Sequence, residues 1–276
     1  VYGIDTIAPA EEWVNIMGRF ISSWRMPLFF SISGFFAILV IERKGTSQFL
    51  KDRVIRVALT CLLFSSLYDI SDGNFDFTTL HLWFLYELMI FVLVFSLLYR
   101  LKIIKDALCV IIPPKLLYFL ALFMVSTVPL AYILNNWWHP SALKASTTYF
   151  DLKPGNLLYY FSYFLAGVIL YSNQNIFIKL KNSKTILLLG TLCLLSFFLR
   201  IYSDHLTIGQ ADSLKQVAQM QFDPLLVFFN SVMIGTNSIS FCLLFIGLGS
   251  KFIQSESAII SWFVELSYPV YIIHII

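Results

Sequence analysis

The chain has 276 residues, of which 58% are hydrophobic, 17% aromatic and only 13% charged, and its mean hydropathy is +0.78. Soluble domains carry roughly a quarter charged residues, so this composition excludes a water-soluble fold. The net charge of +3 arises from Lys and Arg residues scattered among short polar segments with no continuous basic stripe, which argues against nucleic-acid binding.

Eight segments are long and apolar enough, or nearly so, to cross a membrane as helices. A helix that spans the hydrocarbon core needs about 20 mostly apolar residues. The sequence therefore predicts an all-α, polytopic membrane bundle of about eight helices in a single domain, residues 1–276. The predicted spans are Phe20 to Ile41, Val54 to Ile70, Leu80 to Tyr99, Leu116 to Leu134, Leu157 to Ser172, Thr185 to Tyr202, Leu225 to Gly249 and Ala258 to Ile276.

The polar segments between these spans differ in charge, as expected if successive helices cross in opposite directions. One side receives thirteen basic and four acidic residues, and the other receives six basic and ten acidic residues. Cytoplasmic loops are enriched in Lys and Arg, so the first residues are predicted to lie outside the cytoplasm. Eight crossings place the C-terminus outside as well. Because the chain begins with Val1 and stops inside an apolar run, we expect a fragment of a longer protein.

Three segments on the predicted outer side are polar and rich in turn-forming residues: Asp72 to Thr79, Asn135 to Asn156 and Ser203 to Asp223. They form either a mouth for a polar substrate or plain solvated connections. No internal repeat is evident, which weakens the interpretation of the chain as an inverted-repeat transporter.

The four cysteines and the pair Ser33-Gly34 are predicted to contribute to packing between helices. Cys61, Cys109, Cys193 and Cys242 are far apart in the sequence and include no CxxC pair, so neither a disulfide framework nor a metal site is predicted. We expect these cysteines to pack inside the bundle. Ser33-Gly34 in the first span is predicted to allow close helix packing, because no partner base for a nucleophilic serine is identifiable.

Few ionisable residues fall within the predicted spans, and such residues usually face a bundle interior or a water-filled cavity. His81 opens the third span and Glu87 lies about two turns deeper. Their spacing of six residues is about 600° of rotation, so they do not share one helix face. His81 is either a general base or a residue that caps the helix start beside Trp83. Glu265 and His274 lie in the last span.

Two positively charged features lie near the starts of the first two spans. Arg25 precedes Pro27, which suits a first helical turn. Arg25 either reaches the outer surface or provides a fixed positive charge for a carboxylate or an oxyanion. Lys51, Arg53 and Arg56, here called the basic cluster, begin the second span. They either bind phosphates or provide the ordinary cytoplasmic charge that contacts anionic lipid headgroups.

Four strings occur in order along the chain: RMPLFFSISGFF (Arg25 to Phe36), FLKDRVIRV (Phe49 to Val57), HLWFLYEL (His81 to Leu88) and ELSYPVYIIH (Glu265 to His274). Together they resemble the acyltransferase 3 family, most closely its glucan biosynthesis protein C branch of succinyltransferases, across essentially the whole chain. The resemblance implies a ten-helix enzyme of the bacterial inner membrane that moves acyl groups from cytoplasmic acyl-CoA to a periplasmic carbohydrate. One additional helix at each end would place both termini in the cytoplasm.

The resemblance also implies roles for individual residues. His81 and Glu87 are the predicted catalytic residues, and Arg25 and Trp83 are the predicted substrate-binding residues near the outer face. The basic cluster would bind the phosphates of acyl-CoA, which is a co-substrate rather than a bound cofactor. Family members carry an essential His in their first helix, about ten residues after an Arg. This chain lacks that helix, so we expect the fragment alone to be inactive.

Three functions remain open from the sequence. The first is an O-acyltransferase that moves a succinyl or an acetyl group to a glucan or another surface carbohydrate. The second is a transporter or flippase of a lipid-linked sugar or related metabolite, and the third is a membrane scaffold without catalytic activity. The order of the four strings favours the acyltransferase.

Overall fold

A computed structural model of the protein describes residues 9–72, 82–103, 125–130, 152–208 and 223–252. These parts are helical nearly throughout, which confirms the predicted all-α class, and residues 125–130 are also helical. The elements are α1 (Pro9–Lys44), α2 (Thr46–Arg53), the π-helical turn η1 (Val54–Ala58), α3 (Leu59–Asp72), α4 (Trp83–Arg100), α7 (Pro154–Ser172), α8 (Gln174–Leu180), α9 (Ser183–Ile208) and α11 (Pro224–Phe252).

Within the described residues, four helices are long and apolar enough to cross a membrane, which confirms the predicted polytopic bundle. These candidate spans are Ile16–Lys44, Trp83–Arg100, Ser183–Ser203 and Leu225–Phe252. On α9, the large apolar side chains of Leu187, Leu188 and Phe198 are 70%, 68% and 64% exposed, as expected for a surface that contacts lipid.

Two of the other predicted spans correspond to described helices, and two lie partly or wholly outside the described residues. Val54 to Ile70 falls within η1 and α3, which continue α2 without a loop, and Leu157 to Ser172 corresponds to α7. Of the span Leu116 to Leu134, only residues 125–130 are described, and Ala258 to Ile276 lies outside the described residues. The structure also contains a short helix, α8, that the sequence did not predict.

The expectation that Pro27 occupies a first helical turn is wrong. α1 has 36 residues and begins at Pro9, so Pro27 lies inside the helix. A membrane helix tolerates an interior proline because neighbouring groups satisfy the freed backbone carbonyl. Arg25 therefore lies well inside the helix, within the candidate span Ile16–Lys44, and is exposed.

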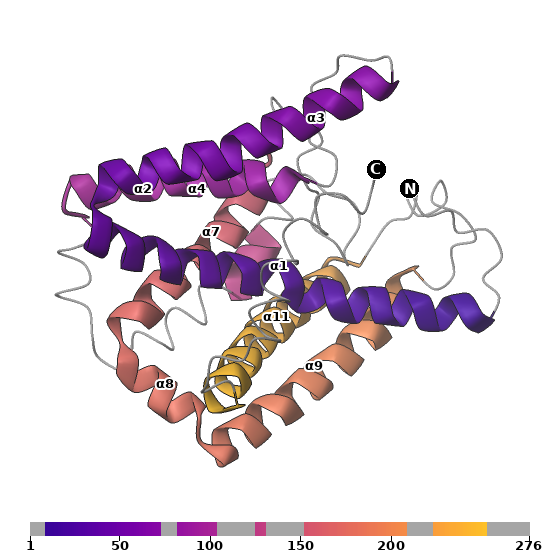
Figure 1. Ribbon diagram of the computed structural model, residues 1–276. Helices are drawn as coiled ribbons and strands as arrows, with labels where there is room; N and C mark the ends of the chain where they lie inside the picture. Colours follow the sequence, from indigo (N-terminus) through magenta and orange to yellow (C-terminus); the bar gives the residue numbers. More distant parts are fainter. Residues whose placement is uncertain (1–8, 73–81, 104–124, 131–151, 209–222, 253–276) are drawn as a thin grey trace.

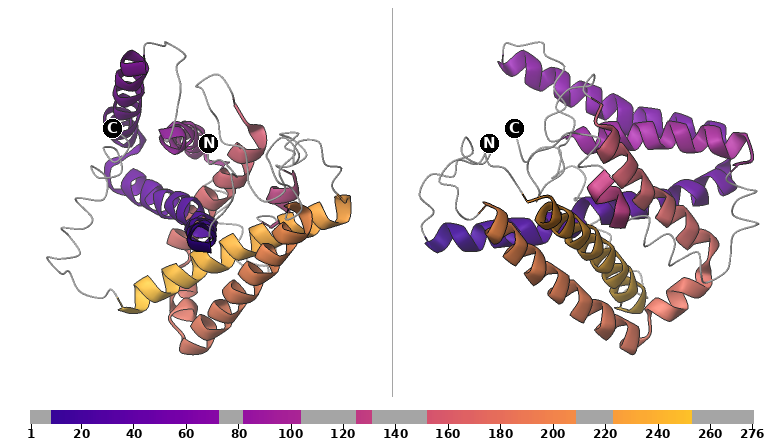
Figure 2. Two further views of the ribbon diagram at one scale, coloured as in Figure 1. Left: turned by 90° about the vertical axis from the view of Figure 1, so that its right-hand side faces the viewer. Right: turned by 180° about the vertical axis from the view of Figure 1, so that it is seen from behind.

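The helices form two groups on either side of α1 (Figure 1). The continuous run α2, η1 and α3 lies beside α4 on one side of α1, and α9 and α11 lie together on the other. α7 crosses α1, and α8 connects the end of α7 to the start of α9. The views in Figure 2 show the same separation.

Ring contacts give the relative directions of three helices. Phe20 and Trp24 on α1 meet Phe241 and Phe245 on α11, with centroids 5.3 and 4.6 Å apart, so α1 and α11 run the same way. Phe30 meets Tyr160 at 5.0 Å and Phe35 meets Tyr171 at 5.3 Å, so α7 also runs in this direction. Equal directions for the first, fifth and seventh predicted spans agree with helices that cross alternately.

Two glycines allow the tightest helix crossing, between α1 and α7. A Cβ atom at Gly34 would overlap the backbone of Phe164, with the carbonyl carbon at 2.8 Å. A Cβ atom at Gly167 would lie 2.8 Å from the backbone nitrogen of Phe35 and would overlap the carbonyl oxygen of Ser31. The prediction that Ser33-Gly34 permits close packing is therefore confirmed for Gly34, and small residues of this kind are typical of membrane helix interfaces.

We predict that Gly34→Leu or Gly167→Leu destabilises the protein, because the new side chain must push two backbones apart. Overpacking of this kind costs about 1–3 kcal/mol and can cost more. Thermal unfolding of detergent-solubilised protein measures the effect. Gly190→Leu is the matched control, because no described atom lies within 4 Å of a Cβ at that helical glycine. Equal melting temperatures for all three variants would contradict the close crossing.

Candidate active site

α4 carries a carboxyl group into the bundle interior. Glu87 has no exposed surface, and its two carboxyl oxygens have no hydrogen-bond partner within the described part of the chain. Phe84 and Phe91, one turn before and one turn after Glu87, are also buried. Because a buried polar group without a partner is unfavourable, an intramembrane carboxyl in this setting is a candidate functional residue.

Tyr160 on α7 connects Glu87 to two other predicted site residues. The ring centroid of Tyr160 lies 5.5 Å from Trp83 on α4 and 5.0 Å from Phe30 on α1. Glu87 and Arg25 both lie within electrostatic range of Tyr160. The structure thus brings three predicted residues, Arg25, Trp83 and Glu87, to one region from two different helices.

Sequence reasoning did not select Tyr160. It lies in the string LYYFSYF, where three tyrosines occur within five residues of a predicted span. Such a density of phenol groups in a membrane helix was an available signal, because buried tyrosine hydroxyls usually require a partner. His81, the other predicted catalytic residue, lies outside the described residues, so its position relative to Glu87 stays a prediction.

The basic cluster lies on the helical run beside α4. Lys51 and Arg56 are exposed, and Arg53 is half-buried with its guanidinium carbon 5.4 Å from the centre of the Phe49 ring. Phe49 itself is completely buried, so its ring anchors this turn in the core and presents one face to the Arg53 cation.

Helix geometry places part of this cluster near the level of Glu87. The Cys61 sulfur lies 3.9 Å from the backbone oxygen of Leu82, and α4 then packs against η1 and α2, so the two helical runs are antiparallel. Arg56 precedes Cys61 by five residues and Glu87 follows Leu82 by five. Five residues span roughly 7 Å along a helix. Arg56 and Glu87 therefore lie at similar heights on adjacent helices.

Arg56 also lies in η1, the π-helical turn Val54–Ala58. π-helical turns interrupt the regular backbone hydrogen-bond pattern and occur frequently at functional sites. The local sequence VIRVA contains neither proline nor glycine and so carried no signal for this turn. Its presence singles out Arg56 within the basic cluster.

A second polar region lies between α1 and α9. Arg200 is only 6% exposed, and its Nη1 donates a hydrogen bond of 2.9 Å to Ser23 Oγ. Ser23 Oγ in turn donates to the backbone oxygen of Arg19 at 2.7 Å. The sequence places Arg200 near the outer end of a predicted span, and the structure adds that its guanidinium is buried against α1, within α9.

Polar groups from α7, α9 and α11 extend this interior surface. Asn237 on α11 donates to Ser196 Oγ and to the Cys193 backbone oxygen on α9, at 3.0 and 3.2 Å. Tyr159 donates to Tyr163 at 3.4 Å within α7. A one-dimensional hydropathy pattern does not detect these pairs, because each residue is an isolated polar position in an apolar run.

Cysteine and metal predictions can be checked for part of the chain. Cys61, Cys193 and Cys242 are free and buried, which confirms their packing role, and Cys109 lies outside the described residues. Within the ranges that the structure describes, no group of three His, Cys, Asp or Glu residues is arranged to hold a metal ion.

Comparison with known proteins gives one family. The acyltransferase 3 model, described as an acyltransferase domain, matches residues 2–276. Searches of curated proteins and of solved structures gave no significant match.

The setting of Glu87 predicts a conflict between function and stability. We expect Glu87→Leu to raise the apparent melting temperature, because it removes a buried polar group without a described partner. Such groups cost about 1–3 kcal/mol. Glu42→Gln is the control: Glu42 is exposed and accepts a hydrogen bond from Tyr171 Oη at 2.8 Å, which the amide oxygen can also accept, so little change is expected. A lower melting temperature for Glu87→Leu would mean that the carboxyl stabilises the fold.

Proposed function

Because the chain belongs to the acyltransferase 3 family, we propose that it is a membrane O-acyltransferase that uses cytoplasmic acyl-CoA to acylate hydroxyl groups of a periplasmic carbohydrate. The enzyme would act in the bacterial inner membrane. The observation that supports an active site best is Glu87, a completely buried carboxyl in the same region as Trp83, Tyr160 and Arg25.

These groups suit a carbohydrate acceptor. A carboxyl group accepts hydrogen bonds from hydroxyls, and Trp83 and Tyr160 offer aromatic faces for the apolar side of a sugar ring. Arg25 supplies a positive charge that would stabilise the oxyanion formed when the acyl carbonyl is attacked. In this role Glu87 orients the acceptor or a nearby polar group.

The proposed reaction forms one bond, breaks one bond and moves one proton. The acceptor hydroxyl oxygen attacks the thioester carbonyl carbon, an O-acyl bond forms, and the bond between that carbon and the CoA sulfur breaks. A general base takes the hydroxyl proton and returns it to the departing thiolate. His81 is the proposed base among the residues of this chain, because an imidazole is suited to this exchange near neutral pH.

The basic cluster is the proposed contact for the donor. CoA carries phosphates, and Arg binds phosphate with several directed hydrogen bonds. The similar heights of Arg56 and Glu87 support a donor and an acceptor that meet along α4. The alternative of anionic lipid at this cluster would leave the affinity for acyl-CoA unchanged when the charges are reversed.

The acyl group and the acceptor follow from the closer resemblance. We propose transfer of a succinyl group to osmoregulated periplasmic glucan, because the four ordered strings most resemble the glucan biosynthesis protein C branch. Acetyl transfer to another surface polysaccharide is the close variant. Mass spectrometry of glucans from cells with and without the gene distinguishes the two mass additions.

Steady-state transfer from succinyl-CoA in membranes that contain the full-length protein tests these roles together. We expect Glu87→Gln to lower kcat by at least about 100-fold with little change in the KM for succinyl-CoA, because positioned acid and base groups contribute factors of this size. Native turnover by Glu87→Gln would remove Glu87 from the active site.

In the same assay, Arg56→Glu should raise the KM for succinyl-CoA at least tenfold, equivalent to about 1.4 kcal/mol, with a smaller effect on kcat. Lys184→Glu, which reverses an exposed charge at the start of α9, is the control and should leave both parameters unchanged. An unchanged KM for Arg56→Glu would contradict the donor site, and sugar translocation without acyl transfer would favour a flippase.

A further inference from the structure

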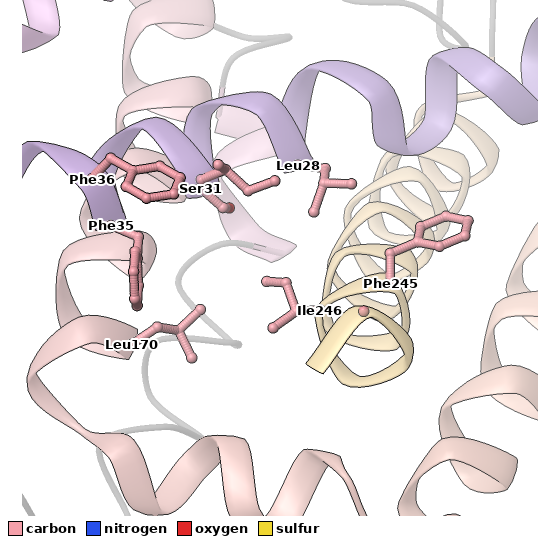
Figure 3. A pocket seen from close by; sticks show the side chains of 9 residues that line it. Leu28, Ser31, Phe35, Phe36, Leu170, Phe245 and Ile246 are labelled. Carbon is pink, nitrogen blue, oxygen red and sulfur yellow. The ribbon is translucent and has the colours of Figure 1, made fainter. Parts of the chain in front are cut away.

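An apolar groove opens between α1 and α11, with the end of α7 as its floor (Figure 3). The two helices touch at Trp24 and Phe245 and then separate toward their C-terminal ends. The space between them has a volume of about 380 Å³. The residues that line it are Leu28, Ser31, Ile32, Phe35, Phe36, Leu170, Phe245, Ile246 and Gly249.

The lining selects for a hydrocarbon ligand. Ser31 contributes the one hydroxyl in this set, and the other side chains are aliphatic or aromatic. The α1 and α11 residues that line the groove belong to candidate membrane spans, so the groove lies at the depth of the hydrocarbon layer. Burial of apolar surface is worth about 25 cal/mol per Å², whereas a polar ligand would lose its hydration here without compensation.

α8 closes one end of the groove and carries positive charge. Phe177 on α8 meets Phe35 at 5.8 Å, and the Leu180 carbonyl oxygen would lie 2.9 Å from a Cβ atom at Gly247 on α11. Lys179 and Lys181, in and directly after α8, are both exposed.

Further charges lie at the same end of these helices. Arg43, in the last turn of α1, is exposed, and Lys251, in the last turn of α11, donates to Ser183 Oγ. The nearby acid Glu42 already accepts a hydrogen bond from Tyr171. The rim at this end is therefore predominantly basic.

We propose that the groove binds one acyl chain of an anionic phospholipid, with the lipid phosphate at Lys179 and Lys181. The apolar lining receives the chain and the lysines recognise the headgroup. Each basic residue near an anionic membrane surface contributes about 1 kcal/mol, so the pair supplies a preference for anionic over zwitterionic lipid. The site is separate from the region of Glu87 and does not rest on the proposed transferase activity.

Two glycines provide a matched test of the groove. No described atom lies within 4 Å of a Cβ atom at Gly249 or at Gly190, and both are helical. Gly249→Leu would fill the groove, whereas Gly190→Leu on α9 leaves it open. Both changes favour the helix by up to about 1 kcal/mol, so neither variant should unfold.

Native mass spectrometry of the protein with added phosphatidylglycerol or phosphatidylcholine of equal chain length gives the readout. We expect wild type and Gly190→Leu to retain phosphatidylglycerol preferentially, and Gly249→Leu to lose at least tenfold in affinity for it. The double variant Lys179→Gln with Lys181→Gln should bind the two lipids equally, while Lys184→Gln keeps the preference.

Several results would overturn the proposal. Equal lipid retention by Gly249→Leu and Gly190→Leu would mean that the groove holds no lipid. Equal binding of both lipids by wild type would remove the role of the lysines. Loss of acyl-CoA binding instead of phospholipid binding in Gly249→Leu would assign the groove to the acyl donor.

Discussion

The close crossing of α1 and α7 at Gly34 and Gly167 determines where the other groups of this protein lie. Membrane helices gain little from hydrophobic association in lipid, so tight backbone contact through small residues becomes a main source of cohesion. Phe30 meets Tyr160 on one side of the crossing, and Phe35 meets Tyr171 on the other. α7 is thereby aligned along α1, with Tyr160 facing α4 and Leu170 under the groove.

Glu87 illustrates how such a framework can support a site that is unfavourable for stability. Its carboxyl is completely buried and has no hydrogen-bond partner within the described part of the chain. In a protein selected for stability alone, a buried polar group without a partner has no advantage. Its presence beside Trp83 and Tyr160 is explained if a substrate hydroxyl or another polar group donates hydrogen bonds to it during function. Stability and activity are then expected to change in opposite directions at this position.

Much of the architecture was predictable from composition and segment length, because a membrane requires long apolar helices and restricts charge to loops. The bounds were less predictable. α1 continues through Pro27 because a proline breaks a membrane helix less readily than its sequence signal suggests. α8 is too short to give a pattern, and the π-helical turn around Arg56 has no sequence signal at all.

The candidate site was predictable in part. Arg25, Trp83 and Glu87 could be selected because ionisable and amphipathic residues are rare in apolar spans. Tyr160 and Arg200 could not be placed, because their significance depends on contacts between helices far apart in the sequence. The sequence places Arg200 near the end of a predicted span but does not show that it pairs with Ser23 on α1.

The proposed activity would join a donor on one side of the membrane to an acceptor on the other. Proteoliposomes of uniform protein orientation test this transfer, with succinyl-CoA supplied only to the face that exposes the basic loops and glucan only to the opposite face. We expect acylated glucan in this arrangement and none when both substrates are confined to the acceptor face. Equal product in the two arrangements would contradict transfer across the membrane.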